Sequence, residues 1–426
     1  MKKTTSLDRR KFLNIAGIIT TAGILPASVY AGENGISATV LAEQIPPVQV
    51  IDNKIAEVLE EKIICIEPGI FLGQGSEFAL NINGHVVVKN RVIEPHRYLG
   101  WPTIAKLTTG KLIVAFSGDR DAHVCPYGKT QIITSDDEGK SWSKPETITN
   151  SPLDDRDAGI IQTRRGTLLV SWFTSLAFEK KAYEVAYQKY FRIGEKIPAK
   201  SKKKWLGNWV RRSEDMGKTW LEPVRTVGTA PHGPIALKNG DLLYIGTKEA
   251  SGIYSIIAET SIDDGKSWEV TGEIPAPPGL VSSRVEPHVL ELTSGKLIAM
   301  VRNEPKDVSQ CFLLQSESID GGQTWSTMKS TGIWGYPPHL IQLKNGYLLV
   351  VYGCRREPYG QRACVSRDEG KTWDIGNEIN LSYAPSRDLG YPSSVQLGDG
   401  SILTVFYQAP KFAEPACLMS THWKLI

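Results

Sequence analysis

The chain has 426 residues, of which 41% are hydrophobic and 22% are charged, and its formal net charge at pH 7 is +3. These values are typical of a water-soluble globular protein, and they exclude a disordered chain and a strongly basic nucleic-acid-binding protein. Because the chain is longer than most single compact domains, a repeat architecture is the first organisation to look for.

Residues 1–31 have the layout of a cleavable export signal, with a charged start and an apolar run from Ile15 to Leu25,. The pair Arg9-Arg10, followed by Lys-Phe-Leu, resembles a twin-arginine signal and predicts a periplasmic or extracellular protein,. The alternative is an ordinary apolar N-terminal helix. Residues 32–62 are expected to form a lead-in with a short helical stretch. No later run reaches the ~20 apolar residues of a membrane span.

Six cysteines are spread along the chain without the spacing of a zinc site. They are Cys65, Cys125, Cys311, Cys354, Cys364 and Cys417. Cys354 and Cys364 are close enough in sequence to face each other across a hairpin. A twin-arginine substrate folds in a reducing cytosol, so we expect all six thiols to be free.

One octapeptide, SxDxGx[ST]W, occurs five times, at residues 135–142, 213–220, 261–268, 318–325 and 366–373. Each copy fits a β-hairpin turn in which Asp and Ser bond to the turn backbone and Gly takes a positive φ. The five aspartates, Asp137, Asp215, Asp263, Asp320 and Asp368, are therefore interpreted as turn residues and not as catalytic carboxylates.

A second repeat reads as strand, tight turn, strand, and its six turn glycines are Gly110, Gly166, Gly240, Gly295, Gly346 and Gly400. Together the two repeats supply four antiparallel strands per unit, which predicts an all-β, six-bladed β-propeller over residues 63–426. The sixth unit lacks the octapeptide. Its outer strands are expected from residues 416–426 and from a strand near Ile63 to Ile66, which would close the ring.

These repeats resemble those of the sialidase and neuraminidase superfamily, in which the octapeptide is called the Asp box. The resemblance covers about residues 63–426 and implies a glycoside hydrolase that acts on the end of a glycan. Asp boxes also occur in propellers that are lyases or that only bind glycans, so the fold alone does not fix the activity.

The face opposite the Asp boxes is formed by residues nine before each turn glycine, by the ends of the second strands and by the loops after them. Loops at one end of a rigid scaffold commonly hold the functional site. The positions nine before each glycine are Trp101, Asp157, Pro231, Glu286, Pro337 and Tyr391.

The resemblance also implies individual site residues. Tyr391, in Gly-Tyr-Pro-Ser-Ser, resembles the catalytic tyrosine of the family, and Glu286, sixteen residues before Arg302, resembles its partner glutamate. Asp121 lies in the loop that holds the family's acid/base aspartate. Arg302 and Arg362 resemble arginines that bind the substrate carboxylate.

These residue types suit an acidic sugar whose anomeric carbon carries a carboxylate, because a neutral tyrosine nucleophile is not repelled as a carboxylate would be. Tyr391 would attack, Glu286 would take its proton, and Asp121 would protonate the leaving oxygen in a retaining reaction. The substrate would be a glycan or glycoconjugate, and no cofactor is expected.

One motif departs from the family pattern, because Gly100-Trp101-Pro102 stands where the family has Arg-Ile-Pro. Arg97 or Arg120 is the candidate replacement for the missing arginine, and with two arginines the site would suit another sugar. Trp101 and Asp157 are further candidates for substrate contacts, although a solvated turn is an equal interpretation of Asp157.

Three histidines, His232, His288 and His339, recur near the starts of the inner strands. Because no HxH or HExxH spacing is present, we predict no metal site and expect His288 to bond a sugar hydroxyl.

The second unit carries an insertion at residues 174–210, since its glycine-to-box spacing is 47 residues against 20 to 25 in the others. It is rich in aromatic residues and lysine, and it would form a lid or a platform for the glycan. A solvated helical excursion is the alternative.

Three functions therefore remain open: an exo-sialidase, a related propeller glycosidase or lyase acting on another sugar, and a non-catalytic glycan-binding propeller.

Overall fold

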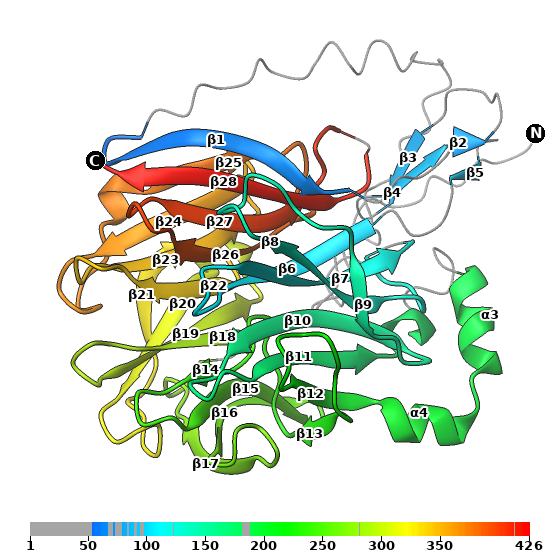
Figure 1. The fold of residues 1–426 in the computed structure, drawn as a ribbon, viewed down its shortest axis with the longest axis horizontal. Helices are drawn as coiled ribbons and strands as arrows, with labels where there is room; N and C mark the ends of the chain where they lie inside the picture. Colours follow the sequence, from blue (N-terminus) through cyan, green and yellow to red (C-terminus); the bar gives the residue numbers. More distant parts are fainter. Residues whose placement is uncertain are drawn as a thin grey trace, which may run out of the picture.

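The computed structural model describes residues 53–66, 71–72, 79–82, 85–88, 92–93, 98–121, 123–180, 188–280, 282–412 and 414–426. Six four-stranded antiparallel sheets lie around a common axis (Figure 1), which confirms the predicted six-bladed β-propeller. The expected export signal and Arg97 lie outside the described residues. No described helix is long and apolar enough to cross a membrane.

The first three blades each run from an inner to an outer strand in chain order. Blade one holds β6 (Tyr98–Lys106), β7 (Leu112–Arg120), β8 (Lys129–Ser135) and β9 (Glu146–Thr149). Blade two holds β10 (Asp154–Gln162), β11 (Leu168–Ser175), β12 (Gly207–Ser213) and β13 (Val224–Thr226). Blade three holds β14 (Ile235–Ala236), β15 (Leu242–Ala250), β16 (Ile253–Ser261) and β17 (Glu269–Ile274).

The other blades repeat this order, except that the sixth takes its outer strand from the beginning of the chain. Blade four holds β18 (Ser282–Glu291), β19 (Leu297–Pro305), β20 (Phe312–Ser318) and β21 (Lys329–Trp334). Blade five holds β22 (Pro338–Gln342), β23 (Leu348–Cys354), β24 (Gly360–Ser366) and β25 (Ile379–Tyr383). Blade six holds β26 (Leu389–Gln396), β27 (Ile402–Gln408), β28 (Cys417–Leu425) and β1 (Ala56–Cys65).

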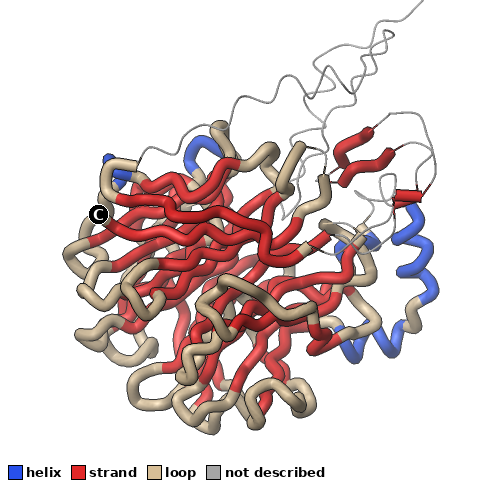
Figure 2. The backbone as a smooth tube through the Cα atoms, turned by 45° about the horizontal axis from the view of Figure 1, so that its top comes forward, coloured by secondary structure: helices blue, strands red, loops and turns tan. Residues whose placement is uncertain are grey.

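Smaller elements lie between these strands. Two short ladders separate β1 from β6, in which β2 (Phe71–Leu72) pairs with β5 (Val92–Ile93) and β3 (Ala79–Ile82) pairs with β4 (His85–Val88). The described residues also include the single-turn helices η1 (Ala177–Glu179), η3 (Val308–Gln310) and η4 (Ile375–Asn377). The insertion of blade two adds α3 (Gln188–Lys196) and α4 (Ala199–Trp205), which lie at one edge of the ring (Figure 2).

Ring closure follows the prediction in outline, since β28 pairs with both β27 and β1. The first strand, however, begins at Ala56 and not near Ile63, so the propeller includes part of the expected lead-in, and residues 56–62 are strand and not helix. Charged side chains such as Glu57 and Glu60 are exposed on this strand. Such residues are common on edge strands, where they discourage pairing with other chains.

The core lies between neighbouring blades, where aliphatic side chains of the inner and second strands are fully buried,. The tight turns between those strands hold the six repeat glycines, whose φ values lie between +88° and +97°,. All six cysteines are buried, and the structure records no disulfide bond between them, which agrees with the prediction from a reducing cytosol,.

Each Asp box closes the hairpin between the third and fourth strands of its blade. In the first box, the Ser135 hydroxyl donates to Asp137 at 2.8 Å, and Asp137 accepts from the Ser141 amide at 2.9 Å. Hydrogen bonds from Ser141 and Ser135 lower the pKa of Asp137 to about 2,. The other four boxes repeat the bond between Asp and the amide four residues later. These carboxylates are turn residues, and they lie at the same end of the blades as the glycine turns.

Candidate active site

Four inner strands change register at the same place, nine residues before the turn glycine. The residue there has a positive φ: 55° at Trp101, 52° at Asp157, 49° at Glu286 and 52° at Tyr391. Positive φ is uncommon for residues other than glycine, and bulges of this kind redirect side chains at functional sites. The bulges of blades one, two, four and six therefore present one tryptophan, two carboxyls and one tyrosine at equivalent positions of the ring.

Tyr391 and Glu286 meet across the axis, as their shared position predicted. The Tyr391 hydroxyl donates to Glu286 Oε1 at 2.6 Å. Arg302 donates from Nη1 to Glu286 Oε2 at 2.5 Å and lies 3.5 Å from the Tyr391 hydroxyl oxygen. Burial, with the nearby charges of Glu286 and Asp157, raises the pKa of Tyr391 well above its usual range,. Tyr391 is therefore a neutral phenol whose hydroxyl is hydrogen-bonded to Glu286.

Arg302 forms ion pairs with two carboxylates. Besides Glu286 it binds Glu304 through Nη2, and its guanidinium lies 4.3 Å from the ring centre of Tyr336. Although burial opposes it, the charges of Glu286 and Glu304 raise the pKa of Arg302. Arg302 thus holds Glu286 in place beside Tyr391.

A second arginine in the site, Arg355, was not identified from the sequence. Its guanidinium lies 5.8 Å from the ring centre of Tyr391, and it donates to two neutral acceptors, Leu389 O at 3.0 Å and the Tyr407 hydroxyl at 3.3 Å. No ion pair of Arg355 is found among the described residues, although its charge helps to lower the pKa of the nearby Asp388 carboxyl. Its position directly after β23, at the end of a second strand, is the signal that could have revealed it.

Arg362, the arginine chosen from the sequence, lies elsewhere in blade five. It donates to Pro358 O at 2.9 Å and to Gln361 O at 3.4 Å, and its Nε is 3.6 Å from Glu378. Its guanidinium faces the ring of Tyr383 at 5.4 Å. The structure therefore does not bring Arg362 to Tyr391, and its role in substrate binding stays a prediction.

Trp101 joins the cluster from blade one, and its ring centre is 6.3 Å from that of Tyr391. Arg156 stacks on Trp101 at 4.2 Å and donates to His123 O at 3.1 Å. Arg120, one of the two candidate replacements for the family arginine, is fully buried in an ion pair with Asp154 at 2.5 Å. Arg156, which directly precedes Asp157 in the sequence, lies closer to Trp101 than Arg120 does.

Asp157 is buried in the same cluster, and its Oδ1 has no hydrogen-bond partner among the described residues. Burial raises the pKa of Asp157 to about 7; Arg156 opposes the rise and the charge of Glu286 adds to it. A carboxyl with a pKa near 7 keeps its proton in a substantial fraction of molecules at neutral pH, so it can donate a proton,.

Asp121 lies in the loop after β7, where it meets the insertion of blade two. Its Oδ2 accepts a hydrogen bond from the Tyr190 hydroxyl of α3 at 2.8 Å. Tyr190 packs with Phe178, Val124 and Cys125 in a small buried cluster. The contact attaches α3 to the blade-one loop, and sequence spacing gave no indication of it.

A hydrogen-bonded network that sequence reasoning also missed lies next to Trp101. Asp388 accepts from the Tyr98 hydroxyl at 3.0 Å and from the Tyr407 hydroxyl at 3.3 Å, and it lies 3.2 Å from His123 Nδ1. Burial opposes ionisation, but the hydrogen bond and charge of His123 keep the pKa of Asp388 below its usual value. The His123 ring packs on Trp101 at 5.0 Å, so the network supports one wall of the cluster.

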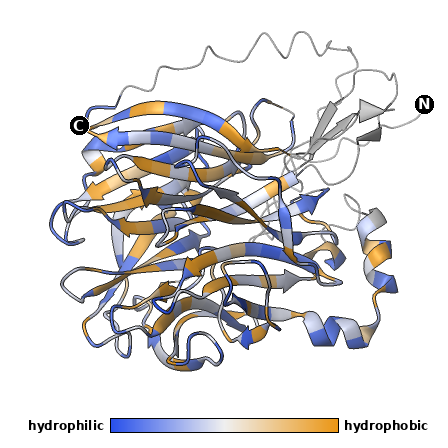
Figure 3. Cartoon of the chain, in the orientation of Figure 1, coloured by the Kyte–Doolittle hydropathy of each residue, from blue (hydrophilic) through white to orange (hydrophobic). Residues whose placement is uncertain are grey.

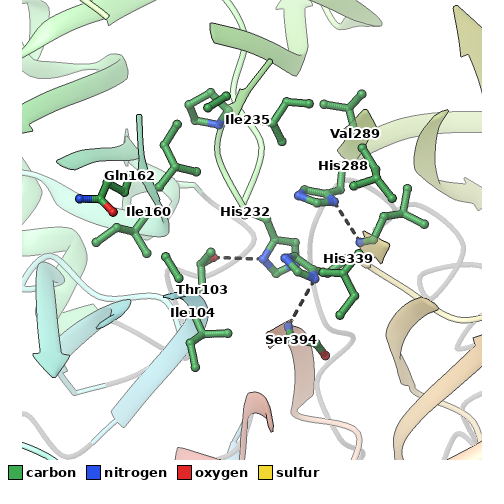
Figure 4. Close-up of a pocket in the computed structure, with 17 residues that line it drawn as sticks. Thr103, Ile104, Ile160, Gln162, His232, Ile235, His288, Val289, His339 and Ser394 are labelled. Carbon is green, nitrogen blue, oxygen red and sulfur yellow. Dashed lines mark hydrogen bonds between the residues drawn. The ribbon is translucent and has the colours of Figure 1, made fainter. Parts of the chain in front are cut away.

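The three histidines lie together, with residues of several inner strands around them (Figure 4). They line a cavity of about 260 Å³, and the rings of His288 and His339 stack at 4.4 Å. His288 Nδ1 accepts from Leu340 N at 3.0 Å, and burial lowers the pKa of His288 to about 3. No group of three or more ligands among the described residues suits a metal ion. His288 thus has a structural bond, and its contact with sugar stays a prediction.

The family model described as BNR repeat-like domain matches residues 195–404. Xyloglucanase Xgh74A from Acetivibrio thermocellus is 25% identical over 206 residues, which are 42% of this chain and 23% of the xyloglucanase. The chain therefore spans less than a quarter of that relative's length.

Solved structures share the fold. A protein of unknown function from Dyadobacter fermentans superposes with a TM-score of 0.67 at 22% identity, over 87% of this chain and 99% of that one. NanB sialidase from Streptococcus pneumoniae gives 0.55 at 16% identity, over 77% and 68%. An α-L-arabinanase from Penicillium chrysogenum gives 0.52 at 15% identity, over 76% and 93%. Residues 195–404 of the chain thus match a BNR repeat-like domain, and its six-bladed ring is similar in fold to sialidases and to an arabinanase.

Proposed function

We propose that this protein is an exported, exo-acting glycoside hydrolase that releases a terminal acidic sugar with retention of configuration, and that Tyr391 is its nucleophile. The observation that carries the proposal is the 2.6 Å hydrogen bond from Tyr391 to Glu286, with Arg302 on the other carboxylate oxygen. A phenol needs an adjacent base to become a nucleophile at neutral pH, and Glu286 is placed to act as that base.

The first step forms a bond between the Tyr391 oxygen and the anomeric carbon while the bond from that carbon to the aglycone oxygen breaks. The phenolic proton passes to Glu286, and the aglycone oxygen takes a proton from a general acid. In the second step water attacks the anomeric carbon and gives its proton to that acid, now a carboxylate. The bond to Tyr391 breaks, and Glu286 returns the proton to the phenolate.

We assign the general acid to Asp157. Its carboxyl lies in the same ring of bulge residues as the nucleophile, and burial raises its pKa to about 7, so it still holds a proton near neutral pH,. The assignment of Asp121 that follows from the family resemblance remains a competing proposal, because Tyr190 already bonds its carboxylate.

The carboxylate of the sugar is assigned to Arg355, with Arg156 as a second donor. Both arginines donate hydrogen bonds mainly to neutral acceptors, whereas Arg302 is held by Glu286 and Glu304. Arg156 has one long ion pair, 3.7 Å to Asp154, and no ion pair of Arg355 is found among the described residues. A guanidinium that is not tightly paired gains most from an incoming anion.

A substrate panel tests this function. Aryl α-glycosides of sialic acid, of a related keto-sugar acid and of a neutral sugar are compared, and proton NMR follows the first product anomer. We expect hydrolysis of an acidic glycoside with the α-anomer formed first. Hydrolysis of the neutral glycoside alone, or an inverted first product, would overturn the proposal.

A second candidate is a glycosidase for a neutral sugar that uses Asp157 and Glu286 as a carboxylate pair. It is favoured by the equivalent bulges that carry these two residues. The fold shared with an arabinanase fits it as well. The same panel distinguishes the two, because a neutral substrate needs no arginine for a carboxylate.

The pH profile tests the acid. Because the pKa of Asp157 is raised to about 7, the carboxyl is protonated below that value, and kcat/KM should fall as the pH rises through it. Asp157→Asn should remove this limb and should slow substrates with poor leaving groups by about a hundredfold or more, while substrates with acidic phenol leaving groups are slowed much less. Asp121→Asn is the matched variant. If it shows this pattern and Asp157→Asn does not, Asp121 is the acid.

A further inference from the structure

The two helices of the insertion form the most positively charged segment among the described residues. Residues 188–205 contain seven lysines and arginines and one glutamate, although the whole chain carries a net charge of only +3. Lys200, Lys203 and Lys204 are exposed on α4, which has no buried residue. Figure 3 shows α4 largely in the blue of hydrophilic residues.

These helices are attached to the wall of the candidate site. Tyr190 of α3 donates to Asp121, two residues before His123 in the blade-one loop. His123 contacts Trp101, and Trp101 contacts Tyr391. An aglycone that leaves the site beside this loop would therefore extend toward α3 and α4.

The chemistry of the helices favours a glycan over a lipid surface. The apolar side chains of α3 pack inward, where Tyr190 is buried and Ile193 is partly buried against the same cluster. A helix that inserts into a membrane needs an exposed apolar face. On α4 the aromatic residue is Trp205, which is only partly exposed and lies 5.1 Å from the Lys204 ammonium. The exposed ammonium groups of α4 suit a sugar that carries an anionic group, because they give this segment a positive field,.

We propose that α3 and α4 form a subsite for an acidic aglycone, so that the substrate is an oligosaccharide with further carboxylate or sulfate groups beyond the terminal sugar. The inference rests on the proposed function for the position of the aglycone. Lys200, Lys203 and Lys204 supply the positive charge, and Trp205, which packs against the core of blade two, anchors α4 to the propeller.

The test uses the triple charge reversal Lys200→Glu, Lys203→Glu and Lys204→Glu. The matched control is Lys140→Glu, Lys266→Glu and Lys371→Glu, three exposed lysines of Asp boxes at the opposite end of the blades. Both sets are made in a Tyr391→Phe background to prevent turnover. Calorimetry measures the affinity for a galacturonic acid hexamer, a heparin-derived hexasaccharide and maltohexaose, at low and at high salt.

We expect at least one acidic hexamer to bind, and the α4 reversal to weaken its binding roughly tenfold or more at low salt, with less effect at high salt. The control reversal should change the affinity less than twofold, and maltohexaose should bind weakly to every variant. Equal losses in both triple variants would overturn the subsite, as would binding only to phosphatidylglycerol vesicles. The two proposals fail separately: if the wild type hydrolyses no glycoside of the panel but the α4 reversal still abolishes binding of an acidic hexamer, only the catalytic proposal is wrong.

Discussion

Tyr391→Phe should lower kcat by about three orders of magnitude or more while the melting temperature changes little. The change removes one oxygen, and the ring still packs against Trp101 and Tyr407. The lost oxygen is the atom that would bond to the sugar, and it is also the donor to Glu286. A loss in kcat on a folded protein is therefore the expected signature of a missing nucleophile.

The matched control is Tyr352→Phe, which also removes one buried hydroxyl, here one bonded to Glu378 in blade five at 2.5 Å. This variant should keep its kcat. A 2,3-difluoro analogue of the acidic sugar should add its glycosyl mass to the wild-type peptide that contains Tyr391, and to no peptide of the Phe variant. Turnover that survives Tyr391→Phe, or a label on a carboxylate, would contradict the tyrosine mechanism.

Three arginine-to-lysine changes should have three different effects. Arg355→Lys should raise KM by about 10- to 100-fold, since an ammonium cannot reproduce the planar fork that binds a carboxylate and each charge-assisted bond contributes about 1.5–3 kcal/mol. Arg302→Lys should act mainly on kcat, because Arg302 positions Glu286 at 2.5 Å. Arg362→Lys should leave both constants nearly unchanged, because Arg362 bonds within blade five.

Steady-state kinetics on an acidic aryl glycoside, with circular dichroism as a check on folding, measures these effects. A large rise in KM for Arg362→Lys, together with none for Arg355→Lys, would contradict the proposal that Arg355 binds the substrate carboxylate. It would instead support Arg362, the arginine chosen from the sequence.

The difference between Arg355 and Arg362 shows which parts of the site the sequence could predict and which it could not. Repeats fix the blade frame, so positions counted from a turn glycine brought Tyr391 and Glu286 together correctly. The direction of a side chain at the end of a strand depends on contacts between blades. Arg362 lies within β24 and faces Glu378, whereas Arg355 follows β23 and reaches Tyr407 of the next blade.

Two other features of the structure could not be predicted from the sequence, for related reasons. The hydrogen bond between Asp121 and Tyr190 joins segments of two different blades, and the insertion that carries Tyr190 has no counterpart in the other units. The start of β1 at Ala56 was not predicted, and an edge strand with exposed glutamates lacks the apolar alternation of a buried strand,. In both cases the deciding partner is distant in sequence.

The position of β28 between β27 and β1 makes the sixth blade depend on two segments that are far apart in the sequence. Each of the other five blades uses one continuous stretch of chain, whereas β1 must pair with residues 417–425. A contact between such distant segments has a larger loop-closure cost than a hairpin, so it forms more slowly. We therefore expect the pairing of β1 with β28 to be a late step in folding, and deletion of β1 to leave one edge of β28 unpaired.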